Sequence, residues 1–345
     1  MHGTAAAPAS VPQIPVILTR PEGNIEIQPL PSGRFSVTLR PRSKDIFIDT
    51  WSCETSFPPE MIEFIAERCR FGFICDALGR HDNPDYIEAV LRRQLFAYFA
   101  PEEFEGKRLL DFGCGGGAST FALAAMLPKT EIVGVELDEE VIQVARRIAE
   151  FRKMPNLRFL VSPSGDRLPS GLGKFDFVMF SAVYEHLLPS ERTVVMPLIW
   201  SAMKTGAALF INQTPHRYFP YEHHSTGLWL INYLPDRAAH FAARKFSRYN
   251  PELNKRGTWT DLLRGGIRGG TEREIMRNLR KAGLPRILQP KRLGLRNRAD
   301  YWLSCTNSSR LKPAKLALAA LFRMTDRLAG TVPSINIDVV IRKDA

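Results

Sequence analysis

The stretch that decides the fold runs from Arg108 to Thr120 and reads RLLDFGCGGGAST. A short apolar run enters a loop with four glycines among the five residues Gly113 to Gly117, and the chain then continues into a helical pattern. Glycine has no Cβ, so the backbone of such a loop can approach a ligand closely, and a helix N-terminus comes directly after it. The stretch therefore predicts a strand, a ligand-binding turn and a helix.

Strands and helices alternate after this loop. Strands are predicted at Arg108–Phe112, Glu131–Glu136, Leu157–Val161, Phe175–Ser181 and Ala207–Gln213, and the run INIDVVIRK (335–343) predicts one more. The helices between them are predicted at Ala118–Leu127, Glu139–Phe151 and Glu191–Met203. This order predicts an α/β fold with a doubly wound, mostly parallel sheet. Ligands of such sheets bind beyond the carboxyl ends of the strands, where the chain reverses direction across the sheet.

The remaining segments predict three parts of the chain. Residues 1–56 are expected to be a tail and a β-rich extension, because alternating polar and apolar runs predict short antiparallel strands there. Residues 57–106 are expected to be a helical segment that leads into the core, and residues 107–345 to be the main domain. Within it, residues 214–270 are expected to be an insertion after the fifth strand that forms a lid.

The charge is distributed unevenly. The net charge is +11, but residues 237–345 hold 24 Lys and Arg against 8 Asp and Glu, a net +16. The first 236 residues therefore hold 47−24 = 23 basic and 36−8 = 28 acidic groups, a net −5. A basic C-terminal third favours an anionic partner such as a nucleic acid, a membrane surface or a phosphorylated substrate.

The cysteines and the apolar runs indicate the cellular compartment of the protein. Five cysteines without a C-x-x-C pair argue against a disulfide framework or a zinc site and fit a reducing compartment. The N-terminus lacks the apolar core of a signal peptide, and no run reaches the roughly 18 apolar residues that a spanning helix needs. We therefore expect a cytoplasmic protein.

Two familiar nucleotide-binding loops can be compared with the glycine-rich turn. A P-loop requires Lys and then Ser or Thr after its last glycine, whereas Gly117 is followed by Ala118 and Ser119. A dinucleotide-binding turn has the pattern G-x-G-x-x-G/A, which Gly113, Gly115 and Ala118 satisfy. The P-loop is excluded, and the dinucleotide-binding turn has to be judged by the downstream segments of the chain.

The turn also resembles the D-x-G-x-G-x-G signature of the class I S-adenosylmethionine-dependent methyltransferases. Its four positions are Asp111, Gly113, Gly115 and Gly117. Downstream, KFDFVMFSAVYEHL (174–187) and MKTGAALFINQTP (203–215) resemble the fourth strand of that family and its turn into the fifth strand. The resemblance covers the middle third of the chain and implies a Rossmann-like methyltransferase fold with S-adenosylmethionine as cofactor.

The resemblance also implies which residues bind the cofactor. They are Asp111, Gly113, Cys114, Gly115, Gly117, Glu136, Leu137, Ser164 and Ser181. Asp111 is expected to contact the methionyl ammonium indirectly or to orient the loop, and Glu136 to accept hydrogen bonds from both ribose hydroxyls. Where the family commonly has Gly-Asp-Ala, with the Asp on the adenine amino group, this chain has Ser164; either Ser164 or Asp166 would make that contact.

The acceptor side is predicted in the stretch TPHRYFPYEHHSTGLWLINYLP (214–235), which is dense in aromatic residues. An oxygen acceptor must lose its proton, which a histidine can take near neutral pH. The predicted catalytic residues are His186, His223 and Glu222, while His216 and His224 are expected at the same sheet edge. Adjacent histidines on an extended segment point in opposite directions, so no metal ligand is assigned.

The predicted function is therefore methyl transfer from S-adenosylmethionine to a small molecule, on an oxygen of a sugar, a glycolipid or a quinone-like metabolite. One alternative is an RNA ribose or guanine methyltransferase that uses the basic C-terminal third, although a nucleic acid is the weaker candidate as partner. Another is a module that binds S-adenosylmethionine without catalysis. An NAD oxidoreductase is disfavoured, because the downstream blocks do not match one.

A basic amphipathic helix is predicted near the C-terminus, in LKPAKLALAALFRMTDRLAG (311–330). Its apolar stripe is formed by Leu311, Leu318, Leu321 and Leu328. We expect this stripe to pack on the sheet. The alternative is that it docks on a membrane surface, where the enzyme would meet an anionic or lipid-linked acceptor.

Overall fold

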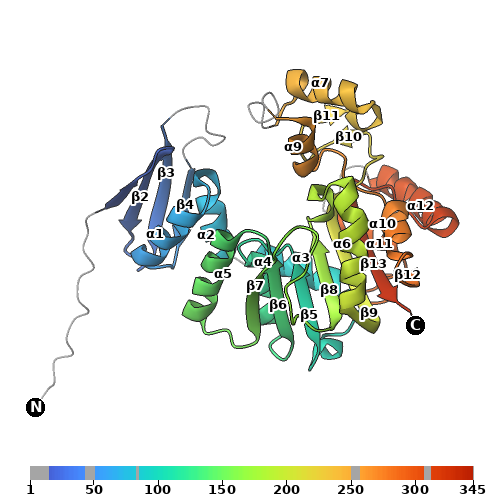
Figure 1. The fold of residues 1–345 in the computed structure, drawn as a ribbon, viewed down its shortest axis with the longest axis horizontal. Helices are drawn as coiled ribbons and strands as arrows, with labels where there is room; N and C mark the ends of the chain where they lie inside the picture. The colour runs from blue at the N-terminus through green and yellow to red at the C-terminus, as the bar shows by residue number, and fades with distance from the viewer. Residues whose placement is uncertain (1–14, 43–50, 83–84, 250–256, 307–311, 345) are drawn as a thin grey trace, which may run out of the picture. The chain divides into compact units, whose positions relative to one another are not determined.

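The computed structural model describes residues 15–42, 51–82, 85–249, 257–306 and 312–344. The predicted tail over residues 1–12 and Leu311 of the predicted stripe lie outside these residues. The chain divides into two compact units, one within residues 1–84 and one within residues 85–345 (Figure 1).

The N-terminal unit is built on an antiparallel sheet with the strand order β1-β2-β3-β4. The strands are β1 (Val16–Thr19), β2 (Gly23–Pro29), β3 (Phe35–Pro41) and β4 (Trp51–Thr55), and the helices are α1 (Pro59–Arg68) and α2 (Ile74–Asp82). Alternate residues of β2 and β3, such as Ile27 and Val37, are buried on one face of the sheet. The predicted β-rich extension is confirmed.

The larger unit contains a seven-stranded sheet with the order β12-β13-β9-β8-β5-β6-β7. Its strands are β5 (Arg108–Phe112), β6 (Glu131–Glu136), β7 (Leu157–Val161), β8 (Phe175–Ser181), β9 (Met203–Pro215), β12 (Pro285–Ile287) and β13 (Asn336–Lys343). Strands β5 to β9 are parallel, and β13 pairs antiparallel with both β9 and β12. The predicted α/β fold with a mostly parallel sheet is confirmed, although β9 is longer than predicted.

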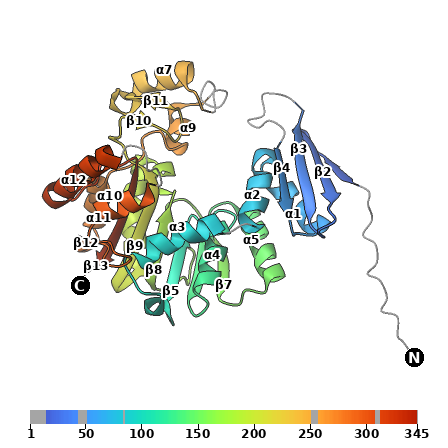
Figure 2. The same ribbon diagram turned by 180° about the vertical axis from the view of Figure 1, so that it is seen from behind.

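Helices cover both faces of this sheet (Figure 2). They are α3 (Asp85–Phe96), α4 (Ala118–Met126), α5 (Glu139–Arg152), α6 (Pro189–Ala202) and α10 (Glu272–Leu279). On one face the ring of Phe177 lies 4.2 Å from that of Phe104, whereas Phe180 on the other face shares a core with Trp200 of α6. Because both faces are buried, β8 is a continuous apolar run interrupted only by Asp176.

The described part of the predicted lid, residues 214–249 and 257–270, forms a small subdomain. It contains β10 (Tyr221–Glu222), β11 (Leu228–Trp229), α7 (Asp236–Phe246) and α9 (Trp259–Arg264). Its own core consists of Ile231, Ala239, Ala243, Leu262 and Ile267. Buried Arg268 donates hydrogen bonds to the carbonyls of Asn232 and Leu234, both at 2.8 Å, and pairs with Asp236. The insertion predicted in the fold is confirmed.

The prediction for the C-terminal helix was wrong. Leu318, Leu321 and Leu328 of α12 (Lys312–Ala329) are exposed, Leu328 by 80%. The helix instead packs through its opposite face, where Phe322 stacks edge-on against Trp302 of α11 (Arg298–Cys305). Phe322 belongs to a buried cluster with Ala299 of α11 and Val332, and this packing leaves the leucine stripe outside. No helix in the described parts of the chain is both long and apolar enough to cross a bilayer.

A buried ion network joins the base of the lid to the C-terminal helices. Arg298 Nη2 donates to Glu272 Oε1 at 2.8 Å, and Arg298 Nη1 donates to Asp326 Oδ1 at 3.0 Å. His216 Nε2 lies 3.3 Å from Glu272 Oε2. Burial alone would raise the pKa of Glu272, but His216 and Arg298 outweigh it and lower that pKa to about 2. These four side chains therefore hold α10, α11 and α12 to the chain that leaves β9.

We predict that Glu272→Gln lowers the free energy of unfolding at pH 7 by about 3–5 kcal/mol, because Arg298 would keep a buried charge without its main partner. The wild-type contribution is present above the unfolded pKa of 4.5 and is lost as the pH falls towards about 2. Urea unfolding should therefore show a steeper loss of stability between these pH values for the wild type than for the variant. Asp344→Asn, which breaks the exposed pair with Arg286, is the control and should barely change stability. Equal unfolding curves for Glu272→Gln and wild type would contradict this role.

Candidate functional site

The glycine-rich turn leaves β5 with a left-handed backbone. Gly113, Gly115 and Gly117 have φ values of 73°, 51° and 84°. The amides of Gly113 and Cys114 donate to the carbonyl of Val135 at 2.8 and 3.1 Å, which ties the turn to β6. The backbone of residues other than glycine is strained in this conformation, which explains why these three positions are glycines.

The glycines also differ in what surrounds them. A Cβ on Gly113 would lie 2.5 Å from Cγ2 of Val183, and one on Gly117 would lie 2.8 Å from the ring of Phe159. A Cβ on Gly115 would meet nothing within 4 Å. Two of the glycines therefore allow close packing of the protein on itself, whereas Gly115 faces open space.

Asp111 comes directly before the turn, and Cys114 is part of it. Asp111 is buried and accepts a hydrogen bond from Thr120 Oγ1 at 2.7 Å, in the first turn of α4. Burial raises the pKa of Asp111 to about 6, against the effect of the Thr120 hydroxyl. Burial also raises the pKa of the Cys114 thiol. The Asp111 carboxylate thus fastens the end of β5 to the start of α4.

Glu136 ends β6 and reaches the same turn. Its Oε2 accepts from the Gly115 amide at 3.0 Å, and its Oε1 accepts from the Leu137 amide at 2.6 Å. A carboxylate offers about four lone-pair positions, so two remain for further donors. Glu136 therefore shapes the glycine turn and keeps the capacity to bind hydroxyl groups.

A cavity of about 240 Å³ opens at the carboxyl ends of β5, β6 and β8. It is lined by Phe112, Gly113, Val135, Glu136, Leu137, Ser162, Gly165, Ala182, Val183, His186, Leu187 and Arg264. Of the predicted site residues, the structure brings Gly113, Glu136, Leu137 and His186 to this wall. Arg264 comes from α9 of the lid and pairs with Glu191, so the lid contributes to the cavity.

The serines predicted near the cofactor differ in position. Ser164 Oγ donates to Asp166 Oδ1 at 2.7 Å, and neither residue lines the cavity. Ser162 lines it instead, held by its amide on the Glu136 carbonyl at 2.7 Å. Ser162 was not predicted, although its place directly after β7 is a signal for it. Ser181 Oγ is buried and has no hydrogen-bond partner among the described residues.

The four histidines separate into different environments. His186 lines the cavity, and its Nδ1 lies 2.6 Å from the carbonyl oxygen of Arg264, so that Nδ1 carries the proton. The His224 ring lies 5.3 Å from that of His186, and burial lowers the pKa of His224. His223 is half-buried with its pKa likewise lowered by burial, and it does not line the cavity. His216 belongs to the ion network of Glu272.

Glu222 is buried within the lid. Its carboxylate accepts hydrogen bonds from the amides of His224 and Ser225, both at 2.8 Å, and from the amide and hydroxyl of Thr226 at 2.6 and 2.5 Å. These bonds build the turn between β10 and β11. A catalytic role for Glu222 or His223 stays a prediction, and the geometry gives Glu222 a role in positioning His224.

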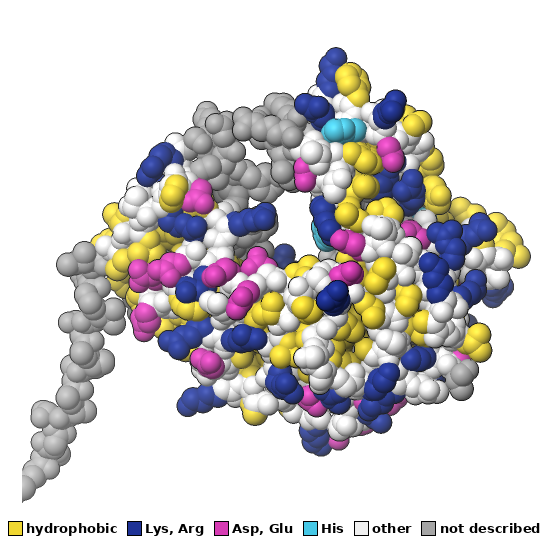
Figure 3. Space-filling view, viewed as in Figure 1, with side chains coloured by type: hydrophobic (Ala, Val, Ile, Leu, Met, Phe, Trp, Pro, Cys, Tyr) yellow, Lys and Arg dark blue, Asp and Glu magenta, His cyan; other side chains and the backbone are white. Residues whose placement is uncertain are grey.

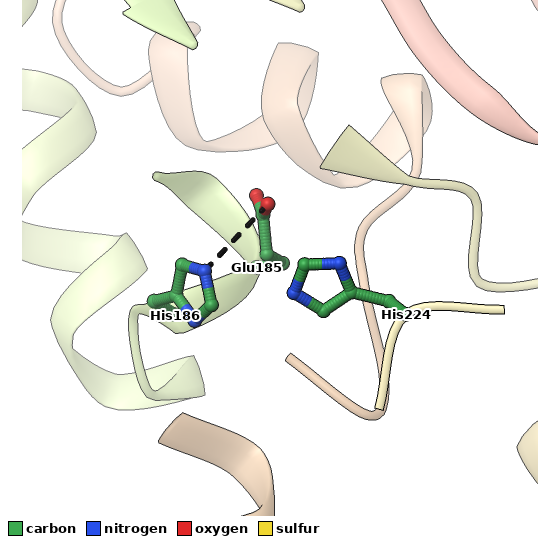
Figure 4. Close-up of side chains that lie close together, drawn as sticks. All are labelled: Glu185, His186 and His224. Atoms are coloured by element: carbon green, nitrogen blue, oxygen red, sulfur yellow. Dashed lines mark ion pairs between the residues drawn. The ribbon is translucent and has the colours of Figure 1, made fainter. Parts of the chain in front are cut away.

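Glu185 is a site residue that sequence reasoning did not single out. It is fully buried, its Oε2 accepts from Thr214 Oγ1 at 3.0 Å, and its Oε1 lies 3.8 Å from His186 Nε2. Burial raises its pKa, against the pull of His186 and Thr214. Figure 4 shows the imidazoles of His186 and His224 on either side of this side chain. The Glu-His pair directly after β8 is a signal for this site in the sequence. The position of its partner from the lid, His224, could not be predicted from the sequence.

Part of the chain that carries this site resembles known proteins. Residues 103–224 match the family model described as a methyltransferase domain. The chain is 28% identical over 116 residues to ubiquinone biosynthesis O-methyltransferase of Acinetobacter baylyi, which covers 33% of this chain and 47% of that protein. It is 37% identical over 116 residues to malonyl-[acyl-carrier protein] O-methyltransferase of Legionella pneumophila, covering 32% and 39%.

The chain spans about half the length, or less, of the curated relatives it matches. Among solved structures, Haemonchus contortus phospholethanolamine N-methyltransferase 2 aligns over 96% of this chain and 71% of that chain. Its sequence identity is 14% and the TM-score is 0.45.

We predict that Gly113→Ala is more destabilising than Gly115→Ala. Both substitutions place alanine at a positive φ, which costs about 1–2 kcal/mol, but the first also drives a methyl group into Val183. That overlap should add roughly 1–3 kcal/mol. Denaturant unfolding of the two variants measures the difference. Equal stabilities would show that the turn after β5 does not pack on the segment after β8 as described.

Proposed function

We propose that this chain, whose residues 103–224 form a domain of the class I S-adenosylmethionine-dependent methyltransferase superfamily, transfers a methyl group from S-adenosylmethionine to an oxygen atom of a small molecule. The observation that carries the proposal is the cavity at the carboxyl ends of β5, β6 and β8. Gly113 of the glycine turn, Glu136 and His186 all line that cavity. It lies where doubly wound sheets bind their ligands.

The residues at this cavity fit the proposed cofactor. Gly113 lines the cavity, and Gly115 of the same turn, although outside the lining, faces open space and leaves the backbone accessible there. Glu136 keeps two lone-pair positions for ribose hydroxyls, and Leu137 and Ser162 line the wall beside it. Asp111 and Thr120 would hold the turn in shape from below. When bound, the cofactor supplies a methyl group on a positively charged sulfur, which is the electrophile.

The chain would then position the acceptor and remove its proton. As the C–O bond forms and the C–S bond breaks, the hydroxyl proton of the acceptor must leave. Since Nδ1 of His186 is held as a donor by the carbonyl of Arg264, Nε2 is the atom with a free lone pair. We place activation of the acceptor at His186 and not at His223, because His186 lines the cavity. Arg264 covers the cavity from the lid and helps to exclude water.

The acceptor proposed is a hydroxyl of a quinone-like metabolite, a glycolipid or a sugar. Two of the relatives described above are named as O-methyltransferases, and one of them as acting in ubiquinone biosynthesis, which supports oxygen as the acceptor atom. The lid exposes the large apolar side chains Trp229, Tyr233 and Phe241, which favours an amphipathic acceptor over a fully polar one.

We predict that the protein binds S-adenosylhomocysteine and that Glu136→Ala weakens this binding about 10–100-fold. This loss of about 1.4–2.7 kcal/mol is the size of one hydrogen bond to a charged acceptor. Isothermal titration calorimetry measures the affinity. Glu139→Ala, which changes an exposed acid three residues further along at the start of α5, is the matched control and should bind as the wild type does.

Three results would contradict the proposed function. Binding of NADH in preference to S-adenosylhomocysteine would assign the glycine turn to a dinucleotide. Tight binding of S-adenosylhomocysteine without transfer of radioactive methyl groups to a hydroquinone, a glycolipid or a sugar would leave the alternative of a non-catalytic module. Transfer of methyl groups to RNA would support the nucleic-acid alternative.

We also propose that the exposed face of α12 binds an anionic membrane surface, where the acceptor would be found. The face is formed by Leu318, Leu321, Met324 and Leu328, all of them exposed. Figure 3 shows hydrophobic and basic side chains side by side over α12. The charge of the C-terminal third, 24 basic against 8 acidic residues, complements anionic lipid headgroups.

We predict that the protein sediments with vesicles of phosphatidylglycerol and phosphatidylcholine, and much less with phosphatidylcholine alone. Leu321→Glu should weaken the binding roughly tenfold or more, since a buried leucine contributes about 1.5–3 kcal/mol. Leu284→Glu is the control, because Leu284 is similarly exposed but lies outside α12. Equal binding of both variants would contradict a docking role for this face.

A further inference from the structure

Three side chains with metal-ligating atoms converge beside the cofactor cavity. Glu185 and His186 follow β8, and His224 comes from the lid between β10 and β11. Each offers one ligand atom, and these atoms lie within 4.8 Å of one another (Figure 4). Two imidazoles and one carboxylate that face a common point form a ligand set typical of divalent transition metals, with further positions left for water or substrate.

Glu185 supplies an independent observation that points to a ligand. Its side chain is fully buried, and Oε2 is bound by Thr214, but Oε1 has no hydrogen-bond partner among the described residues. A buried carboxylate oxygen without a partner is costly and needs an explanation. The nearest ligand atom is Nε2 of His186 at 3.8 Å, too far for a hydrogen bond. A cation between the two would satisfy this oxygen.

The hydrogen bonds of both histidines suit metal binding. Nδ1 of His186 donates to the carbonyl of Arg264 at 2.6 Å, which directs the lone pair of Nε2 towards Glu185. Metal-binding histidines usually hold their second ring nitrogen in this way. His224 is placed by its backbone, whose amide donates to Glu222 Oε1 at 2.8 Å. The buried Glu222 therefore positions a ligand without contacting the cation itself.

Gly266 allows these groups to approach. A Cβ at this residue would lie 2.7 Å from Cδ2 of His224 and 3.2 Å from Cγ of Glu185. Its φ of 90° is also unfavourable for any other residue. The lid is thus shaped so that His224 can lie against the segment after β8. The nearby cations Arg264 and Arg192 are already paired, with Glu191 and Glu274, and do not fill the cluster.

We propose that Glu185, His186 and His224 bind one divalent transition-metal ion, such as Zn²⁺, Mn²⁺ or Fe²⁺, at the acceptor end of the cavity. The site would take an oxygen ligand of the acceptor in an open position. Its role in the reaction rests on the proposed function: a hydroxyl bound to the cation loses its proton more readily, and the oxygen lone pair then forms the C–O bond while the C–S bond breaks. With Nε2 of His186 bound to the cation, His186 acts as a ligand and not as the proton acceptor, and the proton leaves to water.

The test uses the full-length protein after removal of metals with a chelator. Co²⁺ alone is titrated and followed by its visible absorption, and Zn²⁺ and Mg²⁺ are titrated by calorimetry. We expect one Co²⁺ and one Zn²⁺ to bind, and Mg²⁺ to bind far more weakly, because imidazole favours transition metals. His224→Ala should lower the Co²⁺ affinity by about 10–100-fold or more, and Glu185→Gln should do the same if its melting temperature matches that of the wild type.

His223→Ala is the matched control, because His223 neighbours His224 but lies outside the cluster. Its Co²⁺ affinity should equal that of the wild type. An equal loss in His223→Ala, an unchanged affinity in His224→Ala, or no binding by the wild type would each overturn the proposal. S-adenosylhomocysteine is titrated into the same samples without metal. Intact binding there, with no metal binding, overturns this inference alone, whereas metal binding without S-adenosylhomocysteine binding supports the site and contradicts the proposed function.

Discussion

The site depends on one close contact, between the backbone of Gly113 and the side chain of Val183. Because Gly113 has no Cβ, the turn after β5 and the segment after β8 can meet. A Cβ on Gly113 would lie only 2.5 Å from Cγ2 of Val183. The first segment carries the glycine turn that faces Glu136, and the second carries Glu185 and His186. A single steric constraint thus fixes the separation of the proposed cofactor side and the proposed acceptor side of one cavity.

The lid is the second part of this arrangement, and polar contacts hold it over the cavity. Arg264 of α9 pairs with Glu191 at the start of α6 and donates to the His186 carbonyl at 3.3 Å. At the base of the lid, His216 joins the buried pair of Glu272 and Arg298. Such buried ionic contacts contribute more to the choice of one geometry than to net stability. They explain how His224, distant in sequence, reaches Glu185.

The sequence predicted the parallel strands closely because their signal is local. Strands buried on both faces are continuous apolar runs, so β5, β6, β7 and β8 begin and end at the predicted residues. The glycine turn was equally clear. In contrast, the outward orientation of Leu321 depends on Trp302 of α11, and the meeting of Glu185 with His224 depends on how the lid folds. Both features depend on tertiary packing, so neither leaves a periodic pattern in the sequence.

The most direct test of the central claim is a crystal structure of the protein with S-adenosylhomocysteine. We expect electron density in the cavity after β5, with the ribose hydroxyls on the Glu136 carboxylate and the sulfur directed towards His186. Such a pose would place the transferred methyl group beside the Glu185–His186–His224 cluster. Density at another surface, or a sulfur that points away from His186, would contradict the assignment of this cavity as the site of methyl transfer.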